Sequence, residues 1–173
     1  MRGLAVTGEP APETLLAGEL RLDPLDVGDA RELAPLLDDP ALHEFIGGRP
    51  LSEPELEARY RRLVAGAPAG SDASWLNWTV RRSADGRAVG TAQATVSGGE
   101  AALAWVVASR WQGNGYGTAV AGALVAWAQR NGLEPTANIA PGHVASERIA
   151  AGAGLRPTDE WAAGERIWRP PAR

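Results

Sequence analysis

The sequence predicts a single α/β domain built on one central sheet that is mixed but mostly antiparallel. Three observations predict it. Residues 91–96 alternate polar and apolar side chains, the apolar run 101–107 leads into a glycine-rich turn at 112–118, and an alanine-rich amphipathic stretch follows that turn. With 173 residues, 45% hydrophobic and 22% charged, the chain is long enough for one well-buried domain and short for two.

The first half of the domain is expected to hold one strand and two helices. Residues 19–25 alternate as a strand, and residues 29–37 form a short helix that Pro35 interrupts. Ser52 and Glu55 have the spacing of a capping box, which marks the start of the second helix. The apolar face of that helix is predicted to carry Leu56, Tyr60, Leu63 and Val64.

The second half begins with three strands joined by short turns. Residues 78–82, 91–96 and 101–107 form this meander, and the last run is apolar enough for a central strand covered on both faces. The next helix carries apolar residues at helical spacing and stops at Asn131–Gly132. A further strand, a helix and a final hairpin complete the order β-α-α-β-β-β-α-β-α-β-β.

The glycine-rich turn from Gln112 to Thr118 lies between a strand and a helix. Its three glycines remove side chains there, so a bulky anion can approach the backbone N–H groups at the helix start. A Walker loop is excluded because the chain contains no Lys, and the G-x-G-x-G spacing does not fit a dinucleotide fingerprint. The turn therefore predicts phosphate binding; the alternative is a turn that only packs the helix against the strand.

The composition of the chain excludes several classes of function. A net charge of −4 without a basic patch argues against nucleic-acid binding. With no Cys and two separate His residues, thiol chemistry and a metal site are not expected. No apolar run has the length of a membrane span or a signal peptide, so we expect a cytoplasmic protein. Residues 1–18 are expected to form a flexible tail and residues 19–173 the domain.

Two motifs resemble those of the GNAT N-acetyltransferase superfamily. Gln112, Gly115 and Gly117, placed after a fourth strand, resemble its acetyl-CoA signature. The segments 139–146 and 151–155 resemble the second motif of its RimJ/RimL-like branch, the ribosomal-protein N-acetyltransferases. The resemblance covers roughly residues 20–168. It implies the GNAT fold, with six or seven strands, about four helices and a splay between strands four and five.

The resemblance also implies an activity. It is acetyl-CoA-dependent transfer of an acetyl group to a primary amine, on a small molecule or a protein N-terminus. Without a Cys to form an acetyl-enzyme, the amine is expected to attack directly in a ternary complex. The alternative is an acyl-CoA-binding relative with reduced catalysis. The sequence leaves open the acceptor's identity and any homodimer through an edge strand or the C-terminal hairpin.

The donor side of the implied site falls on residues that match the family motifs. The pyrophosphate is expected on backbone N–H groups of residues 113–118, helped by the side chains of Gln112 and Asn114. The main chain of the fourth strand is expected to receive the pantetheine arm and the thioester oxygen. The expected donor-binding residues are Trp105, Val106, Val107, Gln112, Gly113, Asn114, Gly115, Tyr116, Gly117, Thr118 and Ser146.

The catalytic residues are implied less directly. Ser146 has the position whose hydroxyl lies near the CoA sulfur in this branch, although it also suits a helix N-cap. His143 replaces the usual Asn and brings an imidazole that titrates near neutral pH, so it is a further candidate.

The base that deprotonates the amine is the least settled role. Ala102 replaces the usual Glu of the fourth strand, and Glu100 is expected in the preceding turn. Glu44 is our first choice as base or amine anchor. Its neighbours between the first two helices are Asp38, Asp39 and His43. Several Trp side chains suggest an acceptor with an apolar or aromatic portion.

Overall fold

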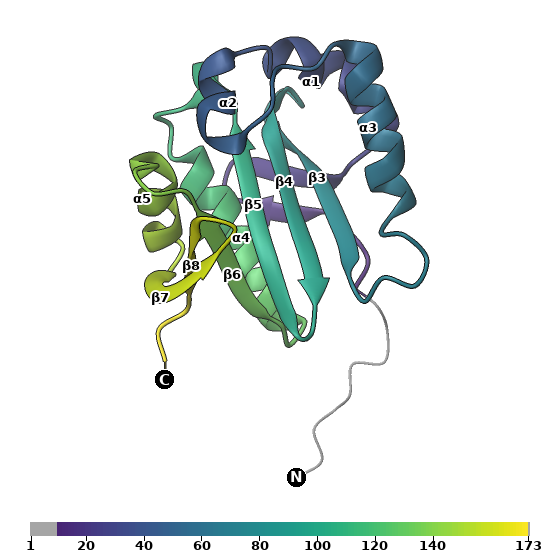
Figure 1. The fold of residues 1–173 in the computed structure, drawn as a ribbon. Coiled ribbons are helices and arrows are strands. Elements are labelled where there is room, and N and C mark those ends of the chain that lie inside the picture. The colour runs from purple at the N-terminus through teal and green to yellow at the C-terminus, as the bar shows by residue number, and fades with distance from the viewer. Residues whose placement is uncertain (1–9, 173) are drawn as a thin grey trace.

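The computed structural model describes residues 10–172. In this part of the chain eight strands form one sheet, in the order β1-β2-β3-β4-β5-β6-β8-β7 (Figure 1). The strands are β1 (Leu15–Ala17), β2 (Leu20–Pro24), β3 (Ser74–Arg82), β4 (Ala88–Ser97), β5 (Glu100–Val107), β6 (Glu134–Ile139), β7 (Arg156–Ala162) and β8 (Glu165–Arg169). Neighbouring strands pair antiparallel except β5 and β6, which pair parallel. The predicted mixed, mostly antiparallel α/β sheet is confirmed.

Five α-helices and two short 3-10 helices complete the described residues. They are η1 (Val27–Asp29), α1 (Ala30–Leu36), α2 (Pro40–Ile46), α3 (Glu53–Ala65), η2 (Ser109–Trp111), α4 (Tyr116–Arg130) and α5 (Val144–Gly152). The sheet thus has one strand more, and the chain one helix more, than the six or seven strands and four helices expected. The additional elements are β1 and α2.

Strand β1 corrects the expected boundary of the N-terminal tail. Leu15 and Ala17 are buried and pair with Leu22 and Leu20 of β2, while Leu16 points outward. This alternation places residues 15–17 in the folded domain, which therefore begins before residue 19. Residues 1–9 of the expected tail lie outside the described residues.

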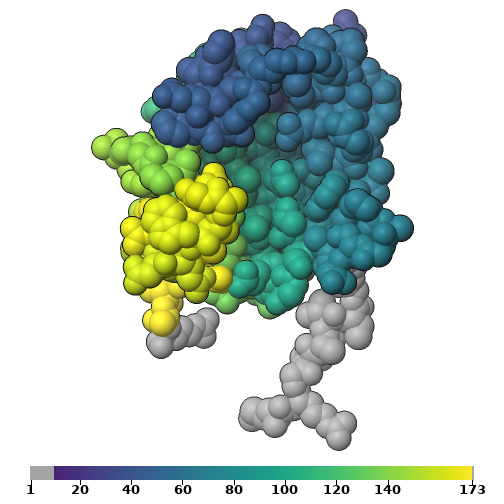
Figure 2. All heavy atoms as spheres, viewed as in Figure 1, coloured from purple at the N-terminus to yellow at the C-terminus, as the bar shows by residue number. Residues whose placement is uncertain are grey.

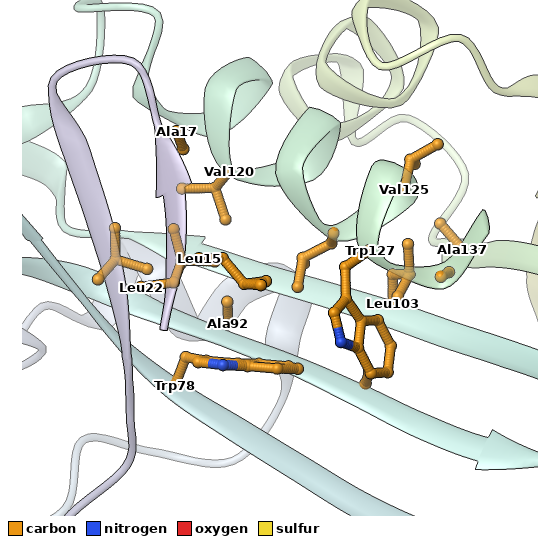
Figure 3. Close-up of a cluster of buried hydrophobic side chains, with 14 of the residues drawn as sticks. Leu15, Ala17, Leu22, Trp78, Ala92, Leu103, Val120, Val125, Trp127 and Ala137 are labelled. Atoms are coloured by element: carbon orange, nitrogen blue, oxygen red, sulfur yellow. The ribbon is translucent and has the colours of Figure 1, made fainter. Parts of the chain in front are cut away.

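One face of the sheet packs against α4. The Trp78 ring of β3 meets the Trp127 ring of α4 edge-on, with the ring centroids 5.5 Å apart (Figure 3). Val120 and Leu124 of the same helix are fully buried in this core. The predicted helical spacing is confirmed, and the core fixes α4 relative to the strands that precede it.

The other face is covered in part by α1 and α3. Leu33, Leu56 and Tyr60 belong to a second buried cluster there. The predicted capping box is present, because the Glu55 carboxylate accepts the Ser52 N–H at 2.9 Å. Val64, expected on the apolar face, is 52% exposed, because the covered stripe of α3 ends at Leu63.

A partly buried ion-pair cluster fastens α1 to the sheet. Arg81 of β3 contacts Asp29 at 2.6 Å and Glu32 at 2.7 Å, and the Thr79 hydroxyl also donates to Asp29. The Arg81 side chain is 18% exposed and that of Asp29 is 14% exposed. These contacts hold the helical layer over β3 and β4.

Strand β5 departs from two expectations. Its central position is as predicted, but Ala102 and Ala104 are exposed, because the helical layer does not cover this part of the sheet. Glu100 begins the strand instead of lying in the turn, and its carboxylate contacts Arg169 of β8 at 2.7 Å. One face of β5 is therefore left open for a ligand. Within residues 10–172 no helix is long and apolar enough to span a membrane.

Candidate active site

The parallel pair β5 and β6 separates partway along its length. Residues 100–102 pair with residues 134–136, and beyond them Ala137–Ile139 pair with β8 instead. On this side Trp105, Val106 and Val107 consequently face a gap, while their other side remains paired with β4. The splay expected between the fourth and fifth strands of the predicted order is confirmed.

A cavity of about 500 Å³, here called the turn cavity, lies along this gap. The cavity is lined by residues 105–107 of β5, the glycine turn, the start of α5 and one side of α2. The Trp105 side chain packs against the core beneath α4. This leaves its main chain as the part expected to contact the donor. All of the expected donor-binding residues except Asn114 line this cavity.

The glycine turn leaves the start of α4 open. Gly113 and Gly115 have φ values of 81° and 77°, the left-handed region that glycine enters without strain. Gly115 is the N-cap of α4 and offers no side-chain cap. The Ala119 N–H bonds back to the Gly115 carbonyl at 3.1 Å, so the three preceding N–H groups, 116–118, have no partner four residues back. These amides are therefore free of helical hydrogen bonds at the position where the sequence predicts an anion site.

The side chains of Gln112 and Asn114 form hydrogen bonds to nearby backbone carbonyls, whereas they were expected to contact the pyrophosphate. Gln112 Nε2 donates to the Val107 carbonyl at 2.9 Å, and Asn114 Nδ2 donates to the Trp111 carbonyl at 2.9 Å. Both amide groups thus brace the turn against its own backbone. In this conformation the N–H groups that remain at the turn belong to the main chain.

Tyr116 and Gly117 of the turn contribute to packing. The Tyr116 ring is buried, and a hydrogen bond to the Glu19 carboxylate raises the pKa of its phenol. Gly117 lies where α5 crosses α4: a Cβ there would stand 2.4 Å from Ile149 Cδ1. Close packing at this crossing sets the position of α5 beside the turn.

Ser146 is not the N-cap of α5, contrary to one reading of the sequence. The helix begins at Val144 with His143 at its N-cap position, so Ser146 is the third helical residue. Its hydroxyl lies 3.5 Å from His143 Nε2. Both residues line the turn cavity, so the hydroxyl and imidazole face the same space.

His143 joins α5 to α2. Its ring stacks on Phe45 with centroids 4.1 Å apart and an interplanar angle of 1°. Burial lowers the pKa of the His143 imidazole, although the nearby Glu147 carboxylate offsets part of this shift. The stack is consistent with a neutral ring at neutral pH and connects both walls of the turn cavity.

A second cavity, here called the sheet cavity, has a volume of about 490 Å³. It lies between α2, α3 and the open face of β3, β4 and β5; Figure 2 shows this face hollowed between the blue helices and the yellow C-terminal hairpin. Leu42, Ile46, Trp105 and Val106 line both cavities. The two cavities therefore meet at the middle of β5.

The structure separates Glu44 from both cavities. Glu44 is exposed on α2 and lines neither one, whereas its neighbour His43 lines the sheet cavity. His43 Nδ1 lies 3.1 Å from the Gly47 carbonyl, which can only accept. Nδ1 is therefore the donor in this hydrogen bond. Asp39 as N-cap and Gly47 at the C-terminal end are the sequence signals for α2. These two bounds determine which face of the helix each of its residues lies on.

A family model, acetyltransferase (GNAT) domain, matches residues 19–156. This chain belongs to the GNAT acetyltransferase family. No curated protein matches the sequence at a significant level. The family assignment agrees with the resemblance drawn from the glycine turn and the 139–146 segment.

Solved structures of GNAT enzymes share the fold at low sequence identity. A putative ribosomal-protein-serine acetyltransferase from Vibrio cholerae has a TM-score of 0.70 and 19% identity, covering 92% of this chain and 98% of its own. The ribosomal L7/L12 α-N-acetyltransferase RimL with coenzyme A has a TM-score of 0.73 and 14% identity, covering 91% and 97%. AAC(6')-Ib with paromomycin and acetyl-CoA has a TM-score of 0.70 and 18% identity, covering 87% and 92%.

Unpaired polar atoms of this GNAT domain gather at the two cavities. Among the described residues, three buried side-chain polar atoms have no hydrogen-bond partner: Tyr60 Oη, Asn77 Nδ2 and Trp111 Nε1. Tyr60 and Asn77 line the sheet cavity, and Trp111 lines the turn cavity. Buried polar groups are normally paired, so these three atoms are exceptions, and their residues lie in the walls of the two cavities. No cluster of three or more potential metal ligands occurs within residues 10–172.

Proposed function

We propose that this protein transfers the acetyl group of acetyl-CoA to a primary amine while both substrates are bound. The observation that carries the proposal is the meeting of two cavities at Trp105 and Val106. One cavity has the open helix start that suits a pyrophosphate, and the other reaches the same strand from the opposite side. A donor and an acceptor can therefore meet at β5 without an acetyl-enzyme, for which the chain has no Cys.

Acetyl-CoA fits the turn cavity in three respects. The amides of residues 116–118 offer N–H groups to an anion, and Trp111 Nε1 is a buried donor without a partner. The unpaired side of β5 offers main-chain groups to an extended pantetheine arm, as an added strand would require. Three of the neighbouring structures named above are transferases, two of them with CoA or acetyl-CoA bound.

Ser146 is proposed as the proton donor to the thiolate that leaves. Its hydroxyl opens onto the turn cavity and has His143 Nε2 as its neighbour at 3.5 Å. The proton that Ser146 gives to the thiolate is replaced from water, and the imidazole next to the hydroxyl orients it. We expect Ser146→Ala to lower kcat while the affinity for CoA stays within about threefold.

His43 is proposed as the base in place of Glu44. It lines the sheet cavity and contacts the Gly47 carbonyl through Nδ1, so Nε2 is the ring nitrogen assigned to the amine, which must lose a proton before or during attack. A positioned general base typically contributes about 10²- to 10⁴-fold. His43→Gln is therefore expected to lower kcat by at least tenfold, and Glu44→Gln, on the exposed side of the same helix, is the matched control.

A second candidate function is acyl-CoA binding with reduced catalysis. It is favoured by Ala102, which leaves β5 without the acidic side chain that the family resemblance implies. The two candidates are separated by measuring thiol release from acetyl-CoA with a panel of amines. Amine-dependent release supports transfer; tight CoA binding with no release for peptides, amino acids, polyamines or aminoglycosides supports the second candidate.

A further inference from the structure

We propose that the acceptor amine carries a carboxylate about 10 Å from its nitrogen, and that Arg59 binds this carboxylate. The inference rests on the proposed function, since it names the acceptor class of the sheet cavity. It is argued from the charges, unpaired donors and strand register of that cavity.

The charge of the sheet cavity is positive. Among the described residues that line it, none is Asp or Glu. Arg49 is already engaged by the Glu55 carboxylate, at 2.5 and 3.1 Å. Arg59 has no ion pair within residues 10–172 and stands on the same stripe of α3 as Leu56 and Leu63. A polycationic acceptor would meet this charge without a carboxylate to balance it.

The unpaired atoms call for an acceptor oxygen. Asn77 is 8% exposed and Tyr60 is 4% exposed, and Asn77 Nδ2 can only donate. Burial raises the pKa of the Tyr60 phenol, and the nearby Arg59 charge only partly offsets this, so the hydroxyl stays protonated and can also donate. Leaving such donors unpaired is unfavourable. An ammonium group cannot accept a hydrogen bond from Asn77 Nδ2, whereas a carboxylate oxygen can accept from an amide, a hydroxyl or a guanidinium, the three kinds of donor that Asn77, Tyr60 and Arg59 bring to this cavity.

The register of the sheet gives the spacing. Asn77 of β3 pairs with Gln93 of β4, and Gln93 pairs with Ala104 of β5. Neighbouring strands lie about 4.8 Å apart, so Asn77 and β5 are separated by about 10 Å. The amine must reach β5, where the cavities meet, while the carboxylate reaches Asn77, Tyr60 and Arg59. An α-amino acid is too short; an extended tripeptide, at about 3.4 Å per residue, or a long ω-amino acid spans the distance.

Four acceptors in two matched pairs test the proposal by kcat/KM. The tripeptide Ala-Leu-Ala is compared with its C-terminal amide, and 8-aminooctanoate is compared with octylamine. We expect the carboxylate member of at least one pair to be preferred at least tenfold, chiefly through KM, and the pair that shows it tells peptide from small-molecule acceptors. Preference for either partner without the carboxylate, or for spermidine over both acids, overturns the proposal.

Substitutions on α3 test whether Arg59 causes the preference for a carboxylate. Arg59→Ala should lower kcat/KM at least tenfold for the acids and change it less than twofold for the amide and octylamine. Arg62→Ala is the matched control, because Arg62 is exposed on the same helix and lines neither cavity. An equal loss in Arg59→Ala for acceptors with and without the carboxylate contradicts carboxylate binding by this side chain.

Binding without chemistry separates this inference from the proposed function. Octanoate has the carboxylate but no amine, and its affinity is compared with that of octanamide by calorimetry. We expect octanoate to bind at least tenfold more tightly, and this difference to vanish in Arg59→Ala. Octanoate binding without acetyl transfer to any amine rejects the function and keeps the anion site. Acetyl transfer without discrimination between octanoate and octanamide rejects only the anion site.

Discussion

Replacing Gly115 with Val should remove CoA binding while leaving the fold intact. Gly115 is the N-cap of α4 with φ at 77°, a conformation that a β-branched residue adopts only under strain of about 1–2 kcal/mol. A Cβ at this position meets no protein atom within 4 Å, so the added side chain projects into open space at the turn cavity. It would stand where an anion approaches the helix start.

The size of the effect follows from the hydrogen bonds lost. Bonds from N–H groups to a charged oxygen contribute about 1.5–3 kcal/mol each, so losing two of them costs about 3–6 kcal/mol. At about 1.4 kcal/mol per tenfold, the Kd for CoA should rise by about 10²- to 10⁴-fold. Calorimetric titration with CoA measures this directly, and circular dichroism checks that the variant is folded.

The matched control for this experiment is Gly122→Ala. Gly122 lies in the same helix, lines neither cavity, and has open space where a Cβ would be placed. The substitution should leave the Kd unchanged and stabilise the protein by about 0.5–1 kcal/mol. If a folded Gly115→Val protein bound CoA within twofold of the wild type, the assignment of the pyrophosphate to this turn would be refuted.

Three further predictions concern stability. Arg81→Ala should lower the free energy of unfolding by about 1–3 kcal/mol in urea titrations, because the partly buried Asp29 carboxylate loses its cation. Gly117→Ala should lower it by about 1 kcal/mol, since overpacking against Ile149 costs about 1–3 kcal/mol and the helix gains only about 1 kcal/mol; adding Ile149→Val should recover part of the loss. Burial lowers the pKa of His143, so the unfolded chain takes up the proton first and stability should fall as pH drops below about 6.5; His143→Gln should show a smaller loss between pH 7 and pH 5 in thermal unfolding.

Each of these predictions has its own control. Arg61→Ala breaks an exposed ion pair with Glu57 and should change stability by less than about 1 kcal/mol; an equal effect of Arg81→Ala would contradict the partly buried cluster. Gly122→Ala serves again for Gly117→Ala, and a stabilised Gly117→Ala protein would show that α5 moves freely at the crossing. An unchanged acid profile in His143→Gln would mean that other groups set the pH dependence.

Local sequence patterns were enough for the strands and helices that carry their own start and stop signals. The Ser52 capping box and the glycine turn were recognised because each places a specific backbone conformation or hydrogen bond at a fixed spacing. Strand β1 was missed because three residues are too few for alternation to stand out beside the preceding prolines.

The geometry of the glycine turn was largely predictable, and that of the sheet cavity was not. The turn lies within seven consecutive residues, so its geometry is local. The choice between His43 and Glu44 depends on the phase of a two-turn helix, in which a shift of one residue moves a side chain by about 100°. Arg59 and Asn77 come together only through tertiary packing and strand register, although an Arg within an apolar helical stripe was a visible signal.

The separation of β5 from β6 also bears on how the molecule unfolds. Strand pairing joins β1–β5 to β6–β8 through only three residue pairs within the described chain, and α4 packs across both groups. A donor bound in the gap between β5 and β6 would contact both groups of strands. The two groups would then unfold together instead of separately. Hydrogen exchange should therefore slow most at the facing edges of β5 and β6 when CoA is added, which makes the ligand a structural part of the sheet as well as a reactant.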